Sequence, residues 1–192
     1  MKEEIESFCP STRQQWRKWL QKNHNKKQSV WLIQYKKSSG ISTISWSDAV
    51  DEALCYGWVD SKRKTIDKDK FMQFFSQRKK NSTWSKINKE KIIRLTKAEL
   101  MSPAGLATIE TAIQNGSWTI LDKVEELMIP KDLEKEFKAH PGSKVFFKSL
   151  SKSLRKMILQ WIELAKRPET RQKRIIEIAT LAAQKQKPKQ FS

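Results

Sequence analysis

The sequence predicts an α+β protein in which a small antiparallel sheet with helices comes first and an all-α helical part follows. Segments rich in β-branched and aromatic residues, which favour strands, occur early in the chain, at residues 30–37 and 58–77. Helix-forming segments dominate the rest, and Pro103, Pro130 and Pro168 stand where the first turn of a helix tolerates proline. This segregation of strands from a run of helices is typical of the α+β class.

Two elements are expected before residue 40. The segment "TRQQWRKWLQKN" (residues 12–23) predicts a short helix capped by Ser11, because its apolar residues gather on one side. The segment "VWLIQYKK" (residues 30–37) predicts a strand. Its two faces both carry apolar residues, which favours a central strand covered on both sides.

A helix and a hairpin are expected next. "SWSDAVDEALCYG" (residues 45–57) predicts a helix capped by Ser45 or Ser47, with acidic residues in its N-terminal half and a glycine at its end. Residues 58–77 predict a β-hairpin that turns at "DKDK", residues 67–70.

The remaining chain predicts helices at residues 85–99, 103–115, a short piece after Trp118, 130–139, 151–166 and 168–184. In the segment 151–166 the apolar residues form one stripe, so this helix is expected to pack on a neighbour. The change from mixed to purely helical patterning predicts two domains, residues 1–125 and 126–192.

The net charge of +18 is concentrated in two stretches of the chain. Residues 62–91 hold 11 Lys or Arg against 3 Asp or Glu, and residues 144–192 hold 13 against 3. The remainder is neutral. Such a concentration predicts an anionic partner, either nucleic acid, a phosphorylated ligand or an anionic lipid surface. The alternative is a set of solvated faces without a partner.

We expect a cytoplasmic protein. No stretch approaches the ~20 apolar residues that a membrane-spanning helix needs, so no transmembrane segment is expected. The N-terminus, "MKEEIESFCPSTRQQW", lacks the basic start and apolar core of a signal peptide. The two cysteines, Cys9 and Cys55, are too few for a disulfide framework.

Neither a metal site nor a cofactor is expected. The two histidines, His24 and His140, lie far apart, without the Cys/His spacing of a metal cage. The five glycines stand singly, so the chain has no glycine-rich phosphate loop. Cys55 could be a nucleophile near Lys and Arg, but a buried structural cysteine is the preferred interpretation, because a helix C-terminus disfavours a thiolate.

The strongest candidate site lies in the hairpin and the segment that follows it. Arg78 and Lys80 come directly before a helix that Ser82 or Ser85 would cap, and cations beside a helix N-terminus form an anion site. The segment "YKKSSGIS" (residues 35–42) could grip a phosphate or simply lead the chain out of its strand.

Aromatic residues and one carboxylate extend this candidate site. Trp58 and Trp84 could stack on a base or a sugar, although core packing is an equal alternative. Asp60 could be a general base, or an ion-pair partner of Lys62 or Arg78.

Five segments carry a resemblance to a known family: "VWLIQYKKSSG", "ISWSDAVDEALCYGWVDSKRKTID", "QFFSQRKKNSTWSKINKEKIIRL", "MSPAGLATIETAIQNGSW" and "LSKSLRKMILQWIELAKRPETRQKRI". Together they resemble the YdeI/OmpD-associated (OmdA) family, also labelled bacteriocin-protection proteins. The resemblance implies a YjbR/CyaY-like α+β domain followed by a small helical domain. It implies no reaction, and it associates the chain with resistance to antimicrobial peptides. Family descriptions often place such proteins in the periplasm, which conflicts with the cytoplasmic expectation.

The residues that could line a site combine aromatic, cationic and small polar groups. The ligand or anion-binding candidates are Tyr35, Lys36, Ser38, Trp58, Asp60, Ser61, Lys62, Arg78, Lys80, Ser82, Trp84, Ser85 and Asn88, with Cys55, Arg167 and Arg171 as secondary candidates.

The favoured function is a non-enzymatic binding protein that contacts an anionic partner, nucleic acid among others, through the hairpin and the C-terminal helices. One alternative is a small-ligand pocket or an uncharacterised enzyme that uses Asp60, Arg78 and Trp84. Another is a protein-interaction module that acts in envelope stress.

Overall fold

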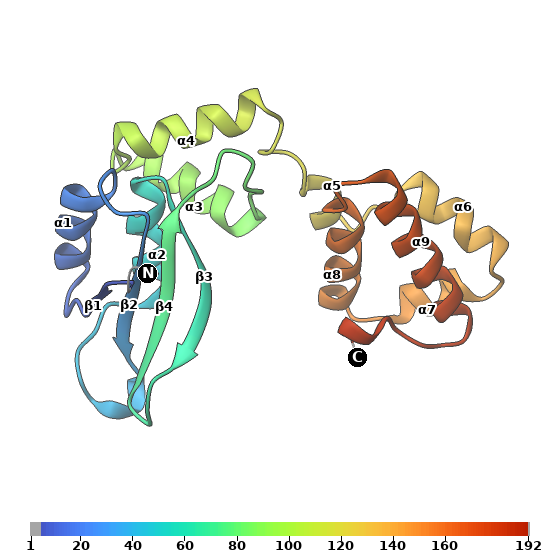
Figure 1. The fold of residues 1–192 in the computed structure, drawn as a ribbon, viewed down its shortest axis with the longest axis horizontal. Coiled ribbons are helices and arrows are strands. Elements are labelled where there is room, and N and C mark those ends of the chain that lie inside the picture. Colours follow the sequence, from blue (N-terminus) through green and yellow to red (C-terminus); the bar gives the residue numbers. More distant parts are fainter. Residues whose placement is uncertain (1–4, 192) are drawn as a thin grey trace. The chain divides into compact units, whose positions relative to one another are not determined.

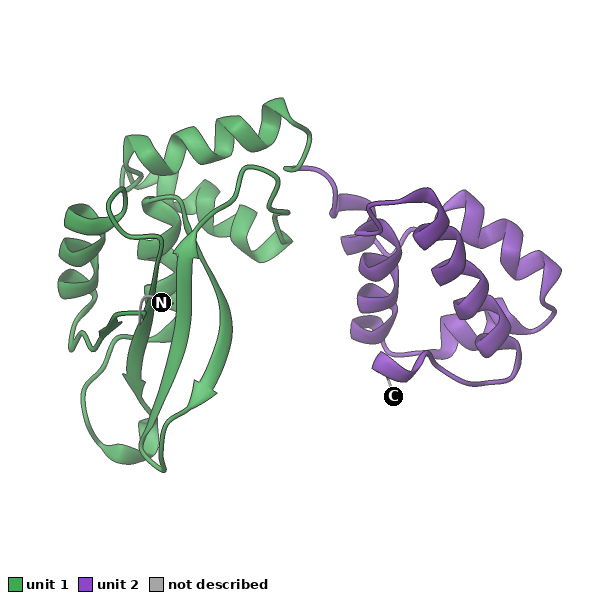
Figure 2. Ribbon diagram, viewed as in Figure 1, with its two compact units in different colours: residues 1–118 green, residues 119–192 purple. Residues whose placement is uncertain are grey.

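The computed structural model describes residues 5–191 and divides into two compact units, residues 1–118 and 119–192 (Figures 1 and 2). The elements of unit 1 are β1 (Ser7–Phe8), α1 (Arg13–Asn23), β2 (Ser29–Tyr35), the 3-10 turn η1 (Lys37–Ser39), α2 (Trp46–Cys55), β3 (Trp58–Thr65), β4 (Lys70–Gln77), α3 (Lys86–Lys97) and α4 (Pro103–Gln114). Those of unit 2 are α5 (Asp122–Glu125), α6 (Lys131–Ala139), α7 (Ser143–Ser149), α8 (Lys152–Glu163), α9 (Pro168–Ala183) and the 3-10 turn η2 (Lys189–Phe191). The predicted α+β class is confirmed.

The sheet of unit 1 has the strand order β1-β2-β4-β3. Strand β4 pairs antiparallel with both β2 and β3, which confirms the predicted hairpin, and its register places Trp31 opposite Phe74. An irregularity in β3 between Asp60 and Arg63 shifts the register. The two-residue strand β1 adds a parallel edge that the sequence did not predict, because so short a pairing leaves no alternating pattern.

The buried face of the sheet is formed by alternate residues of β2 and β4. Val30 and Leu32 of β2 and Phe75 of β4 are fully buried, and the indole of Trp16 on α1 lies 5.4 Å from the Phe75 ring. The alternate residues of β2, beginning with Trp31, are only partly buried. The prediction that this strand is covered on both sides is therefore wrong: its second apolar face stays partly exposed.

Side-chain caps fix where the helices begin. Ser45 caps α2 and Ser85 caps α3, each accepting a hydrogen bond from the backbone N–H three residues on. The cap of α1 is Thr12, not Ser11 as predicted. Helix α7 was not predicted, because it follows Gly142, spans few residues and has no side-chain cap to mark its start.

Unit 2 buries its own apolar core. Leu133 of α6, Ile158 and Ile162 of α8, and Ile178 of α9 are at most 2% exposed. The rings of Phe137 and Phe147 join α6 to α7 at 5.4 Å. The apolar stripe predicted for residues 151–166 therefore packs inward.

Two neighbouring carboxylates on α2 tie the helices of unit 1 together. Asp51 accepts hydrogen bonds from Lys91 at 2.7 Å and Arg94 at 2.5 Å, both on α3. Glu52 accepts from Arg13 at 2.5 Å and Arg17 at 2.7 Å, both on α1. Both carboxylate residues are 2% exposed, so their charges are balanced by these partners rather than by water.

The junction between α2 and α4 depends on backbone contact. A Cβ atom on Gly105 would lie 2.3 Å from the carbonyl oxygen of Cys55, closer than any real contact allows. Ser102, the cap of α4, donates its hydroxyl to that same carbonyl oxygen at 2.6 Å. The first turn of α4 thus packs directly against the C-terminal end of α2.

Replacing Gly105 by Ala is expected to lower the unfolding free energy of the protein by about 1–3 kcal/mol, because the added methyl group must push two backbones apart. Urea unfolding followed by tryptophan fluorescence measures the change. Leu106→Ala, at a 46% exposed position of the same helix, is the control and should change the stability by less than about 0.5 kcal/mol. Equal stability of the Gly105→Ala protein and wild type would contradict the close junction.

Replacing Asp51 by Asn is expected to cost about 3 kcal/mol at pH 7, because the 11% exposed Lys91 side chain then lacks a carboxylate. Burial opposes ionisation of Asp51, yet its hydrogen bonds from Lys91 and Arg94 hold its pKa below the usual value. Because the pKa of Asp51 is lower in the folded state, its ion pairs contribute fully to stability when the pH lies above the unfolded-state pKa of about 3.9. This contribution is lost as the pH falls through the folded-state pKa.

The difference in urea midpoint between the Asp51→Asn protein and wild type should therefore be largest near neutral pH and should narrow as the pH falls below about 4. Glu110→Gln, at an exposed position of α4, is the control. A difference that stays constant from pH 7 to pH 3 would show that the carboxylate charge of Asp51 contributes nothing.

Candidate functional site

The partly exposed face of the sheet combines aromatic rings with lysines. We call it the outer sheet face, and it comprises Trp31, Ile33 and Tyr35 of β2, Lys70, Met72 and Phe74 of β4, and Lys62 and Lys64 of β3. It forms because a period of two places these alternate residues away from the buried side. Among residues 5–191, no helix has the length and apolar character needed to cross a membrane.

The lysines of the outer sheet face lie over its rings. The Nζ atom of Lys62 lies 5.7 Å from the centroid of Phe74, and that of Lys64 lies 5.2 Å from Trp31. The two rings themselves meet edge to face at 5.0 Å. Neither lysine forms an ion pair with a carboxylate among residues 5–191.

The candidate residues at the end of β2 lie in two different places, the outer sheet face and the turn that follows β2. Tyr35 belongs to the outer sheet face, and the Nζ atom of Lys70 lies 5.4 Å from its ring. Lys36 instead donates to the carbonyl oxygen of Asp67 at 2.9 Å, and Ser38 lies exposed in η1. The side chains of "YKKSSGIS" that were expected to bind a phosphate therefore do not lie together in a single cluster.

Asp60 serves the structure of the hairpin. Its Oδ2 accepts hydrogen bonds from Trp46 Nε1 at 3.0 Å and Gln73 Nε2 at 3.1 Å. The same Gln73 amide donates to the carbonyl oxygen of Ser61, itself an exposed residue. The expected ion pair of Asp60 with Lys62 or Arg78 is absent from the described residues, because these amide and indole groups take its place.

The segment after β4 has two different surfaces. Arg78 stacks on the ring of Trp84 at 3.7 Å and is partly buried, whereas Lys80 is exposed. Ser85 caps α3 by accepting the Asn88 N–H, and Ser82 donates its own N–H to the carbonyl of Lys79 in a turn. Trp84 is 1% exposed and Trp58 is fully buried, so both belong to the core rather than to an open stacking surface.

A cavity of about 320 Å³ borders Arg78 in unit 1. It lies where the end of α1, the turn between α2 and β3, the end of β4 and the first turns of α4 come together. Trp58 and Arg78 are the candidates that line it, and neither Asp60 nor Trp84 does. Sequence reasoning missed His24 and Thr108, which join this site through the fold and have no local signal.

Cys55 is a buried structural residue. Burial raises the pKa of its thiol, and the neighbouring Glu52 carboxylate raises it further. A thiolate is therefore disfavoured, which agrees with the preferred interpretation from sequence. Within residues 5–191 no group of three His, Cys, Asp or Glu residues is placed to hold a metal ion.

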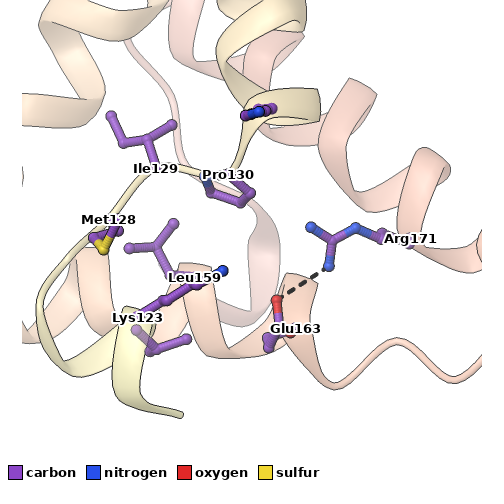
Figure 3. Close-up of a pocket in the computed structure, with 9 residues that line it drawn as sticks. Lys123, Met128, Ile129, Pro130, Leu159, Glu163 and Arg171 are labelled. Atoms are coloured by element: carbon purple, nitrogen blue, oxygen red, sulfur yellow. Dashed lines mark hydrogen bonds and ion pairs between the residues drawn. The ribbon is translucent and has the colours of Figure 1, made fainter. Parts of the chain in front are cut away.

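In unit 2, a cavity of about 390 Å³ lies beside Arg171. Figure 3 shows Leu159, Ile129 and Met128 around the hollow, with Arg171 directed toward Glu163. Arg171 also donates to both carboxylate oxygens of Asp132, so its charge is already balanced. Arg167 is exposed at the start of α9. Arg171 thus holds helices of unit 2 together, and Arg167 faces solvent.

Two family models match the chain. Residues 8–108 match a domain of unknown function (DUF8412), and residues 126–185 match "Bacteriocin-protection, YdeI or OmpD-Associated" (OmdA). The first is a different model from the YjbR/CyaY-like domain that the resemblance implied. Neither a curated protein nor a solved structure matches. The chain therefore belongs to the DUF8412 family, and its second unit carries a bacteriocin-protection, YdeI or OmpD-associated domain.

Proposed function

We propose that the protein is a non-enzymatic binding protein of the bacteriocin-protection type whose partner is single-stranded nucleic acid, held on the outer sheet face. The observation that supports this most directly is the pair of lysines, Lys62 over Phe74 and Lys64 over Trp31, which form no ion pair with a carboxylate among the described residues. The basic residues of 144–192 supply further positive charge, which would assist the attraction of an anionic polymer.

The physical basis is the pairing of two kinds of contact. Each base has a flat face that can stack on an aromatic ring, and one such contact is worth about 1–3 kcal/mol. Each phosphate can meet an ammonium group, and such contacts position the nucleic acid on the protein. Open sheet faces with exposed aromatics recognise single strands in this way, because a duplex hides its base faces.

We also propose that the protein is cytoplasmic, a location that suits a nucleic-acid partner. We also retain a YjbR/CyaY-like relation of residues 1–125 as a proposal, supported by a small sheet packed on helices. The boundary between domains 1–125 and 126–192 is likewise proposed.

A small-ligand pocket is the second candidate function. The cavity beside Arg78 favours it, although Asp60 faces Trp46 and Gln73 instead of this cavity. This candidate needs Arg78 and not the lysines of the outer sheet face, so the two functions respond to different substitutions.

The test is fluorescence polarisation with short single-stranded DNA and RNA at two salt concentrations. Replacing both Lys62 and Lys64 by Ala is expected to weaken binding about tenfold or more at low salt. The slope of log K against log salt should fall by about 0.7 for each lysine that meets a phosphate. Trp31→Ala should weaken binding by about fivefold or more at both salt concentrations, because stacking does not depend on counterions.

The matched control replaces Lys18 and Lys22 by Ala, which removes the same charge from exposed positions of α1. It should retain most of the affinity. Equal losses in the control and in the Lys62/Lys64 variant would reduce the binding to net charge, and weak binding by every protein would remove nucleic acid as the partner.

A further inference from the structure

Arg78 carries a buried charge that its surroundings leave unbalanced. Its guanidinium stacks on Trp84, and Nη1 donates to the carbonyl oxygen of Thr83 at 2.9 Å. Its Nε and Nη2 atoms are buried without a hydrogen-bond partner among residues 5–191, and so is Nε1 of Trp84. Buried polar groups without partners are rare in folded proteins, and each one calls for an explanation.

The other arginines at the helix junctions have carboxylate partners. Arg13 and Arg17 pair with Glu52, Arg94 pairs with Asp51, and Arg171 pairs with Asp132. Arg78 forms no such pair within the described part of the chain. Burial lowers its pKa to about 10, and the more distant Asp60 only partly opposes this. Arg78 thus stays protonated at neutral pH at the expense of stability, because a buried charge is costly without a counter-charge.

A cavity of about 320 Å³ lies beside Arg78. The residues lining it include His24, Tyr56, Gln77 and Thr108, and no acidic residue is among them. The His24 Nδ1 atom lies 3.0 Å from the carbonyl oxygen of Leu20, which favours the proton on Nδ1. The walls of the cavity therefore present polar groups but no negative side-chain charge.

The shape of this cavity is fixed by the fold. Gly57 lies in its wall with φ of +72°, and a Cβ atom there would lie 2.6 Å from Thr108 Cγ2. Its carbonyl oxygen accepts the backbone N–H of Arg78 at 2.9 Å. On the other side, Trp58 and Gln77 both donate to the carbonyl oxygen of His24, at 3.1 and 2.8 Å. These contacts preorganise the site before any ligand arrives.

We propose that this cavity binds a small oxyanion, a carboxylate or a phosphate group, with the guanidinium of Arg78 as its counter-charge. A guanidinium is a planar fork of donors that matches both groups, and it is less strongly hydrated than an ammonium. The cavity volume of about 320 Å³ falls near the lower end of small-molecule sites, which suits a small oxyanion. This site is separate from the outer sheet face and does not depend on the proposed nucleic-acid binding, but it rests on the second candidate function, the small-ligand pocket beside Arg78.

The first experiment compares the melting temperature of the full-length protein in sodium phosphate, sodium acetate and sodium chloride at equal ionic strength. A ligand that binds only the folded state raises the melting temperature as its concentration exceeds its Kd. We expect phosphate or acetate at about 50 mM to raise it above the chloride value, and the anion that acts distinguishes the two ligand classes. In the Arg78→Gln protein the rise should be lost, whereas Lys79→Gln, at the exposed neighbouring position, should retain it.

The second experiment needs no variant at the site, so it remains decisive if Arg78→Gln fails to fold. In a ¹H–¹⁵N spectrum of the wild type, the effective anion should shift the indole N–H peaks of Trp84 and Trp58 in a saturable way. The indole peak of Trp161, in unit 2, should not move. Equal melting temperatures in the three salts, or a common shift of every indole peak, would overturn the proposal.

Discussion

The adjacent buried carboxylates of Asp51 and Glu52 are the interaction on which unit 1 depends. One binds two cations of α3 and the other binds two cations of α1, so the single helix α2 positions both of its neighbours. Removing Asp51 would leave the ammonium group of Lys91, whose side chain is 11% exposed, without a carboxylate, which costs more than the loss of one hydrogen bond. Helix α2 thus joins α1 to α3 through these ion pairs.

The cavity beside Arg78 illustrates that dependence. Helix α2 ends at Cys55, whose carbonyl oxygen contacts the first turn of α4. Gly57 then turns the chain into β3. These two close contacts bring Thr108 of α4 to the wall that also contains Arg78. A small displacement of α2 would therefore open or fill the cavity, although none of its lining residues belongs to the carboxylate pairs.

The sequence predicted what local chemistry determines. The β-branched and aromatic residues of 58–77 were sufficient to predict the hairpin. For two helices the sequence offered two caps each, Ser45 or Ser47 and Ser82 or Ser85, and the structure uses Ser45 and Ser85. It could not predict β1 or α7, which lack a cap or a repeating pattern. Among the candidate residues, Arg78 and Trp58 do line one cavity. His24 and Thr108 are brought there only by tertiary packing, and no spacing in the chain could have indicated them.

The fate of the basic stretch 62–91 shows why net charge alone is a poor guide to a binding surface. Of its cations, Lys91 neutralises a buried aspartate, and Arg78 lies against Trp84 inside unit 1. Lys62 and Lys64 instead lie over aromatic rings on the outer sheet face. One stretch of sequence therefore supplies a structural ion pair, a buried cation and a solvent-facing pair of lysines. An anionic partner would contact only those cations that no carboxylate of the protein already neutralises. The position of the unpaired cations, and not the net charge, therefore determines where such a partner could bind.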